Sequence, residues 1–207
     1  TSSNGIAWTQ TNSGLANVNF TDFATDGTTV IGTVNTGGQL IKSTTATSWS
    51  VQALGISGIG SLNSIIYVPA TSKWVAVGGA GTIITSPDGD TWTIQTSPVS
   101  TTYRAVVYGN GRYVAVSSSV GGIAAWSTDA VTWTQSATGL TQGLLRMTFV
   151  NGVFVAVGLN GTIASSTDGV TWSAAHTVPN AASENINDVV ANGTDGTAKV
   201  VAVGGST

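Results

Sequence analysis

The sequence predicts an all-β protein, a five-bladed β-propeller of four-stranded antiparallel blades. Five tryptophans recur at intervals of 41, 43, 41 and 39 residues, and joining the chain ends would give a fifth interval of 43: Trp8, Trp49, Trp92, Trp133 and Trp172. An interval near 40 residues accommodates four short strands, which is one propeller blade. Short runs rich in Val, Ile and Thr alternate with Gly-containing turns, and no helical apolar period is present.

The unit between Trp133 and Trp172 shows the predicted internal order of a blade. Strands are expected over 144–150, 153–158 and 162–165, separated by Asn-Gly pairs at 151–152 and 160–161 that favour tight hairpins. A fourth strand follows the tryptophan. The other units repeat this order, with strands expected over 65–67, 74–78 and 82–85, over 106–108, 113–116 and 122–125, and over 29–32 and 39–42.

The units form one domain, residues 1–207, that is closed by pairing of the N- and C-terminal segments. The repeat boundaries are about 8–49, 49–92, 92–133, 133–172, and 172–207 joined to 1–8. We expect Ile6–Trp8 to supply the outermost strand of the blade that begins with 187–203, because closure removes open sheet edges. Compared with the fourth unit, this seam lacks three residues equivalent to 162–164. The third strand of that blade is therefore expected to be interrupted, or the natural chain to be longer.

A seven-residue motif ends each unit. Ser166-Thr-Asp168-Gly169-Val-Thr171-Trp172 resembles the Asp-box, or BNR repeat, of sialidases and related propellers, which also occurs in bacterial secreted proteins and bacteriophage appendages. The resemblance covers nearly the whole chain and implies boxes at hairpins on the outer rim of a propeller. Similar boxes contain Asp88 and Asp129, a weaker one contains Asn4, and Thr45 replaces the acid in another.

The box residues are interpreted as structural. A carboxylate can accept backbone N–H groups within its own turn, and the following Gly tolerates a positive φ. The Trp is large enough to fill space between hairpins or blades. A catalytic carboxylate would not tolerate replacement by Thr45. A metal site built from Asp88, Asp129 and Asp168 is disfavoured because the three lie on different blades.

The composition restricts the function classes. Only 7% of the residues are charged, the net charge is −3, and 33 Thr and 23 Ser dominate the polar residues. A nucleic-acid partner would require a basic surface, and no apolar run is long enough for a membrane helix. The absence of Cys excludes disulfides and thiolate metal sites. No metal or cofactor is expected. A surface of hydroxyls suits an extracellular or virion protein, and a start at Thr1 without Met suggests processing or excision from a longer chain.

The residues available for catalysis are few. Sialidases require an arginine triad and a Tyr–Glu pair, whereas this chain has three Arg and one Glu, so that activity is not transferred. A hydrolytic pair could be drawn from Asp22, Glu184 and Asp188. The favoured interpretation of these acids is loop solvation and strand-end hydrogen bonding. His176, the single His, is interpreted as an exposed loop residue. We therefore predict no catalytic residues and no enzyme activity.

One pattern suggests a ligand site. In all five units an apolar residue followed by Asn or Arg opens the predicted innermost strand, and the polar members are Asn19, Asn63, Arg104, Arg146 and Asn187. Innermost strands surround the channel of a propeller, so these side chains would form a ring at its mouth. They could bind a ligand or satisfy the unpartnered inner strand edge. Both interpretations remain open.

The function expected from the sequence is a non-catalytic binding or structural module. A phage virion appendage or a secreted or cell-surface protein fits best, with a glycan or a protein surface as partner. The alternative is a carbohydrate-binding lectin with one shallow site per blade. This alternative is weakened because the loops before the inner strands differ, at 12–17, 53–60, 96–102, 136–143 and 174–184. A glycoside hydrolase is the least favoured reading.

Overall fold

The computed structural model describes residues 1–2, 4–10, 19–35, 37–52, 54–136, 138–173, 176–177, 184–192 and 198–205, with the backbone only at 176–177. Its regular elements are strands and two short 3₁₀ turns. In chain order they are β1 (Phe20–Thr25), β2 (Val30–Val34), β3 (Leu40–Ser43), β4 (Ser50–Gln52), β5 (Leu62–Val68), β6 (Lys73–Gly78), η1 (Gly79–Gly81), β7 (Ile83–Ser86), β8 (Thr93–Ile94), β9 (Tyr103–Gly109), β10 (Arg112–Ser117), β11 (Ala124–Ser127), β12 (Thr134–Ser136), β13 (Leu144–Val150), β14 (Val153–Gly158), η2 (Leu159–Gly161), β15 (Thr162–Ser166), β16 (His176–Thr177), β17 (Asn185–Asn192) and β18 (Lys199–Gly205).

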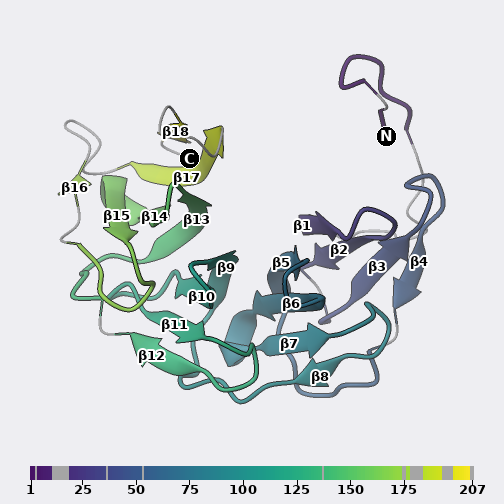
Figure 1. Ribbon diagram of the computed structural model, residues 1–207, viewed down its shortest axis with the longest axis horizontal. Helices are drawn as coiled ribbons and strands as arrows, with labels where there is room; N and C mark the ends of the chain where they lie inside the picture. The colour runs from purple at the N-terminus through teal and green to yellow at the C-terminus, as the bar shows by residue number, and fades with distance from the viewer. Residues whose placement is uncertain are drawn as a thin grey trace.

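The strands form four four-stranded antiparallel sheets and one two-stranded sheet, each in sequence order. We call the four complete sheets blade 1 (β1–β4), blade 2 (β5–β8), blade 3 (β9–β12) and blade 4 (β13–β16), and the fifth sheet the β17–β18 hairpin. The sheets are arranged side by side around a centre, with β1, β5, β9, β13 and β17 innermost (Figure 1). The predicted all-β class and four-stranded blades are confirmed.

The hairpin turns set the register of each blade. Asn151 and Gly152 both have positive φ, 49° and 77°, and join β13 to β14 so that Val150 pairs with Val153. Asn110 and Gly111 make the same turn in blade 3. These residue types adopt positive φ at low cost, so in blades 3 and 4 the second, apolar strand begins directly after a two-residue turn.

The predicted boxes form folded turns of one design. Asp168 Oδ1 accepts the backbone N–H groups of Val170 and Thr171, both at 2.8 Å, while the Ser166 hydroxyl accepts that of Gly169. Asp88 and Asp129 make the corresponding bonds. In the two weaker boxes Asn4 Oδ1 and Thr45 Oγ1 accept the equivalent pairs, at 2.9 and 3.0 Å and at 3.3 Å. An amide and a hydroxyl therefore replace the carboxylate.

The box tryptophans pack against the preceding blade. Trp92 belongs to a core cluster with Ile31 of blade 1, and Trp133 to one with Val75 of blade 2. Trp172 likewise packs with residues of blade 3, and the three side chains are only 6%, 7% and 8% exposed. The boxes of blades 2, 3 and 4 therefore each fix a large apolar side chain in the interface with the preceding blade.

The predicted pairing of the chain ends is not present in this structure. Residues 1–2 and 4–10 lie apart from the β17–β18 hairpin, on the other side of an opening in the ring (Figure 1). Trp8 is 74% exposed and Ile6 is 85% exposed. The N-terminal box keeps its fold through local bonds alone. Four complete blades and the two-stranded β17–β18 sheet are therefore what the described residues form.

The Asp168 carboxylate should stabilise its turn by the two N–H groups that it accepts. Asp168→Ala is expected to lower the free energy of unfolding by about 1–2 kcal/mol in urea denaturation. Asp168→Asn should cost less, because Asn4 already accepts the same pair of donors. Equal stability of the Ala variant and the wild type would contradict the structural role.

The box acids should also make stability depend on pH. Backbone N–H donors, that of Thr91 foremost, hold the pKa of Asp88 at about 2, and the pKa of Asp129 is held at about 2 by Thr132 foremost. The ordinary value is 3.8, so the folded state favours the carboxylate. Their contribution is fully present above the unfolded pKa and is lost as the pH falls towards 2.

A variant with Asp88→Asn, Asp129→Asn and Asp168→Asn tests this dependence. Its melting temperature should decline less than that of the wild type between about pH 5 and 2, because none of the three turns then titrates. Parallel profiles for both proteins would show that other groups cause acid unfolding.

Candidate functional site

The innermost strands carry a β-bulge at the same place in every sheet. Two consecutive residues of each inner strand oppose a single residue of the second strand, as Leu62 and Asn63 do beside Gly78. The pairs are Phe20–Thr21, Leu62–Asn63, Tyr103–Arg104, Leu144–Leu145 and Ile186–Asn187. A bulge redirects side chains locally. The second member of each pair is the position that the structure repeats around the centre.

The predicted ring does not occupy one register. Asn63, Arg104 and Asn187 are second members of the bulge pairs, whereas Arg146 lies one residue later and Asn19 two residues before Thr21. The sequence pattern was aligned on the apolar residue before each Asn or Arg. The apolar first residue of the bulge pair is instead Leu144 in blade 4 and Phe20 in blade 1. In blade 4, counting back from the Asn-Gly turn would have revealed the offset at Arg146.

Two bulge residues bond to the next blade. Asn63 Nδ2 donates to the Tyr103 carbonyl of blade 3 at 2.7 Å, and Asn63 is buried. Thr21 Oγ1 donates to the Leu62 carbonyl of blade 2 at 2.8 Å. Asn63 therefore satisfies an inner strand edge, as one interpretation of the sequence anticipated. Asn19 and Asn187 are exposed.

Arg104 and Arg146 bring two guanidinium groups to neighbouring inner strands. Arg146 Nη1 donates to the carbonyls of Leu145 at 3.1 Å and of Arg104 at 3.4 Å. Arg104 is half-buried, and its Nε is buried without a hydrogen-bond partner in the described part of the chain. Burial, and secondarily the charge of Arg146, lowers the pKa of Arg104. Among the described residues the one ion pair joins Lys42 to Asp90. Arg104 and Arg146 therefore have no carboxylate partner among those residues.

Two of the candidate acids make structural hydrogen bonds. Asp22 is committed to structure, because it accepts the N–H groups of Phe23 at 2.8 Å and Ile65 at 3.0 Å and the Ser64 hydroxyl at 2.9 Å. Asp188 occupies the same register on β17 and accepts the Val189 N–H. The side chain of His176 and most of the loop 174–184 lie outside the described residues, as does the loop 12–17.

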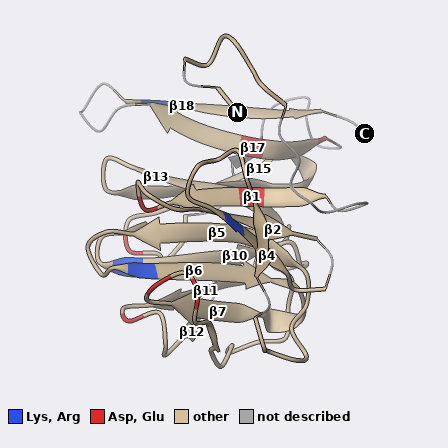
Figure 2. Cartoon of the chain, turned by 90° about the vertical axis from the view of Figure 1, so that its right-hand side faces the viewer, with Lys and Arg blue, Asp and Glu red and all other residues tan. Residues whose placement is uncertain are grey.

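Charged residues are sparse along the strands (Figure 2). Within the ranges that the structure describes, no three His, Asp or Glu residues converge as metal ligands. No helix among them is long and apolar enough to cross a membrane.

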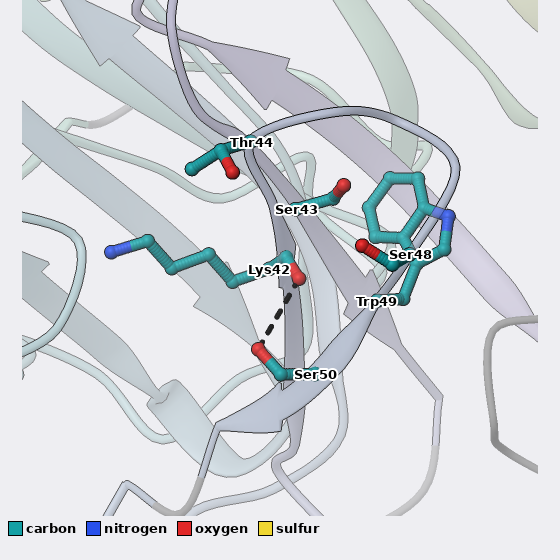
Figure 3. Close-up of a pocket in the computed structure, with 6 residues that line it drawn as sticks. All are labelled: Lys42, Ser43, Thr44, Ser48, Trp49 and Ser50. Atoms are coloured by element: carbon teal, nitrogen blue, oxygen red, sulfur yellow. Dashed lines mark hydrogen bonds between the residues drawn. The ribbon is translucent and has the colours of Figure 1, made fainter.

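A second feature is a depression beside the box tryptophans on the outer rim. In blade 1 it has a volume of about 270 Å³ and is lined by Lys42, Ser43, Thr44, Ser48, Trp49 and Ser50 (Figure 3). The equivalent depression of blade 4, of about 310 Å³, is lined by Ser165, Ser166, Thr167, Thr171, Trp172 and Ser173. Hydroxyl groups and one indole thus recur at the same place on two blades.

Cations at the hairpin turns link neighbouring blades, which the sequence analysis missed. Lys73 Nζ donates to the carbonyl of Asp129 at 2.7 Å, and Arg112 Nη1 to that of Asp168 at 3.0 Å. The Arg112 guanidinium also lies 5.2 Å from the centroid of Trp126. The long stem of Arg112 reaches the box of the next blade, where a backbone carbonyl accepts its charge-assisted hydrogen bond.

Comparison with known proteins gives no matching family model and no matching curated sequence. Solved structures do match. YCF48 bound to D1 peptide has a TM-score of 0.63 at 19% identity, covering 84% of this chain and 57% of that one. A virginiamycin B lyase from Staphylococcus aureus has a TM-score of 0.68 at 12% identity, with coverages of 82% and 60%. The GH74 enzyme of Niastella koreensis has a TM-score of 0.57 at 21% identity, with coverages of 83% and 26%.

The chain therefore spans somewhat more than half the length of the first two structures and about a quarter of the third. At these identities the likeness concerns the fold alone. The chain has a β-propeller fold, and its four-stranded antiparallel sheets match those of propeller proteins.

Proposed function

We propose that the complete molecule is a closed ring of five blades of the Asp-box type, with a fifth blade made from both ends of the chain. The support is a repeated register. Thr1 and Thr9 exchange backbone hydrogen bonds of 2.6 and 2.7 Å around the Asn4 box. Thr85 and Thr93 are paired across the Asp88 box in the same way. The N-terminal segment is thus an outer hairpin, and β17–β18 is an inner one.

We further propose that the protein is a non-catalytic binding or structural module. The carrying observation is the pair Arg104 and Arg146, which lie on the innermost strands of neighbouring blades in a charge-poor molecule without a carboxylate partner among the described residues. Guanidinium groups bind carboxylates in a bidentate fork, and neighbouring amides can bond to sugar hydroxyls. The ligand class is therefore an acidic peptide or an acidic, polyhydroxylated glycan.

The similar structure of YCF48 was solved with a bound peptide, which supports a peptide as the kind of ligand that such a fold accepts. The surface rich in Ser and Thr supports a setting outside the cytoplasm, either in a phage virion appendage or in a secreted or cell-surface protein. Assembly with other chains on such a particle or surface belongs to this proposal.

The test is a double variant, Arg104→Ala with Arg146→Ala, assayed on a peptide library with free C-terminal carboxylates and on an array that includes acidic glycans. We expect affinity for the best wild-type ligand to fall about tenfold or more, because a charge-assisted hydrogen bond contributes about 1.5–3 kcal/mol. The melting temperature should change little.

The matched control is Lys73→Ala with Arg112→Ala, which removes the same charge from the outer hairpin turns. This control should retain ligand binding and lose stability, because both cations donate to the next box. Equal loss of binding in the two variants would assign the effect to net charge and overturn the site. Turnover of glycoside substrates by the wild type would overturn the non-catalytic proposal.

A lectin is the second candidate, and the recurring rim depressions favour it. Trp49 and Trp172 line equivalent depressions beside several hydroxyls. The indole of Trp49 is half-buried, whereas that of Trp172 is only 8% exposed. Apolar sugar faces pack on aromatic rings, whereas hydroxyls bond to polar side chains.

Trp49→Phe and Ser50→Ala together test this candidate. If the rim is the lectin site, this variant should lose glycan-array signal while the Arg104 and Arg146 variant keeps it. A rim lectin would be excluded if the Trp49 and Ser50 variant kept the glycan-array signal, the Arg104 and Arg146 variant lost it, and the wild type bound no neutral glycan.

A further inference from the structure

The complete blade interfaces are built from the same positions. In the interface of blades 2 and 3, Val75 and Val77 of blade 2 pack against Tyr103, Val106 and Trp133 of blade 3. Val114 and Val116 of blade 3 pack against Leu144, Met147 and Trp172 in the next interface. Each blade thus has a forward face on its second strand and a backward face made by its inner strand and its box Trp.

The same positions are apolar but exposed at the opening of the ring. On the forward side of the β17–β18 hairpin, Val201 and Val203 are 54% and 57% exposed, whereas Val75 and Val77 are fully buried. Val190, which pairs with Val201, is 61% exposed. Val201 and Val203 therefore lie exposed at register positions that are interior in blade 2, which indicates an interface that lacks its partner.

The backward face of blade 1 supplies the other side. Phe20 and Phe23 occupy the register of Tyr103 and Val106, and they are 40% and 47% exposed instead of buried. Trp49, the box Trp of this blade, is half-buried and lies edge-on to Phe23.

Polar groups at the opening repeat the pattern as well. Lys199 opens the second strand of its hairpin in the register of Lys73 and Arg112, both of which donate to the carbonyl of the acidic box position in the next blade. In blade 1 that box position is Thr45. Asn187 occupies the register of Asn63, which donates to the first bulge residue of the next blade.

We propose that the β17–β18 hairpin packs against blade 1 of the same chain, with Val190, Val201 and Val203 covering Phe20, Phe23 and Trp49. Lys199 then donates to the Thr45 carbonyl, and Asn187 to that of Phe20. The same chain is favoured over a second copy because blades 1–4 already curve towards closure, and a tethered partner has a high effective concentration (Figure 1). This inference rests on the closed ring proposed above.

A disulfide trap tests the interface, because the chain has no Cys of its own. Val190→Cys with Phe23→Cys should form an intramolecular bond under mild oxidation, seen as a monomer with altered mobility on a non-reducing gel. The matched control is Ile66→Cys with Val106→Cys, at the same register between blades 2 and 3. A covalent dimer would show that a second copy occupies the face. A pair that stays reduced while the control cross-links would also overturn the proposal.

Lys199→Ala provides a test that needs no cross-link. Its melting temperature should fall by about 2–4 °C, as expected for one lost interaction in a domain of this size, and Lys73→Ala should fall similarly. An unchanged melting temperature for Lys199→Ala beside a lowered one for Lys73→Ala would overturn the contact. Neither result alters ligand binding through Arg104 and Arg146, so this inference can fail separately from the proposed binding function.

Discussion

Packing of one blade against the next is the interaction on which the rest of this structure depends. Each sheet has two apolar faces, so an isolated blade would leave residues such as Val75 and Tyr103 in water. A four-stranded sheet of this size gains its stability by covering those faces with its neighbours. The strands can therefore be almost free of charge, because their side chains face other blades. The same requirement makes the exposed valines of β18 informative, since their positions belong to an interior face.

The Asp-box serves this packing from the rim. It closes a turn with side-chain oxygens, and the closed turn fixes the indole that enters the preceding interface. What the turn requires is an acceptor within reach of two N–H groups, so Asn4 and Thr45 can stand in for Asp88. Trp8 shows that the turn and its packing are separable. Its box is folded although its indole is exposed. Local hydrogen bonds form the box, and tertiary contacts then bury its Trp.

Much of the fold could be predicted because the turns that separate its strands are formed by local sequence signals. Asn-Gly turns with positive φ and the boxes bracket each strand, so β13 and β14 were placed at their observed bounds. The bulges were not predictable from the same signals. In blade 4 the bulge pair is two leucines, Leu144 and Leu145, and the apolar pattern does not show which of them is the first member, so the predicted ring was shifted by one position to Arg146. The contact of Arg112 with the Asp168 carbonyl was missed because it joins residues 56 apart on different blades. Such contacts depend on how blades stack, which no single repeat encodes.

The arginine pair is the place where the scaffold departs from its own repeat. The register of Arg146 holds Asp22, Ser64, Ala105 and Asp188 in the other sheets. Asp22 and Ser64 accept backbone N–H groups of the next blade, whereas Ala105 offers no acceptor. A guanidinium cannot accept a hydrogen bond, so blade 4 gives up this inter-blade contact at Arg146. In the neighbouring blade Arg104 replaces an amide that, at Asn63, satisfies a carbonyl, and its Nε remains buried without a partner in the described residues. Arg146 compensates in part, because it donates to the Arg104 carbonyl at 3.4 Å, whereas the buried Nε of Arg104 has no compensating partner among those residues. Departures of this kind from an otherwise consistent pattern are expected where a sequence is shaped by binding rather than by folding. This is the physical reason for placing the proposed ligand site at Arg104 and Arg146.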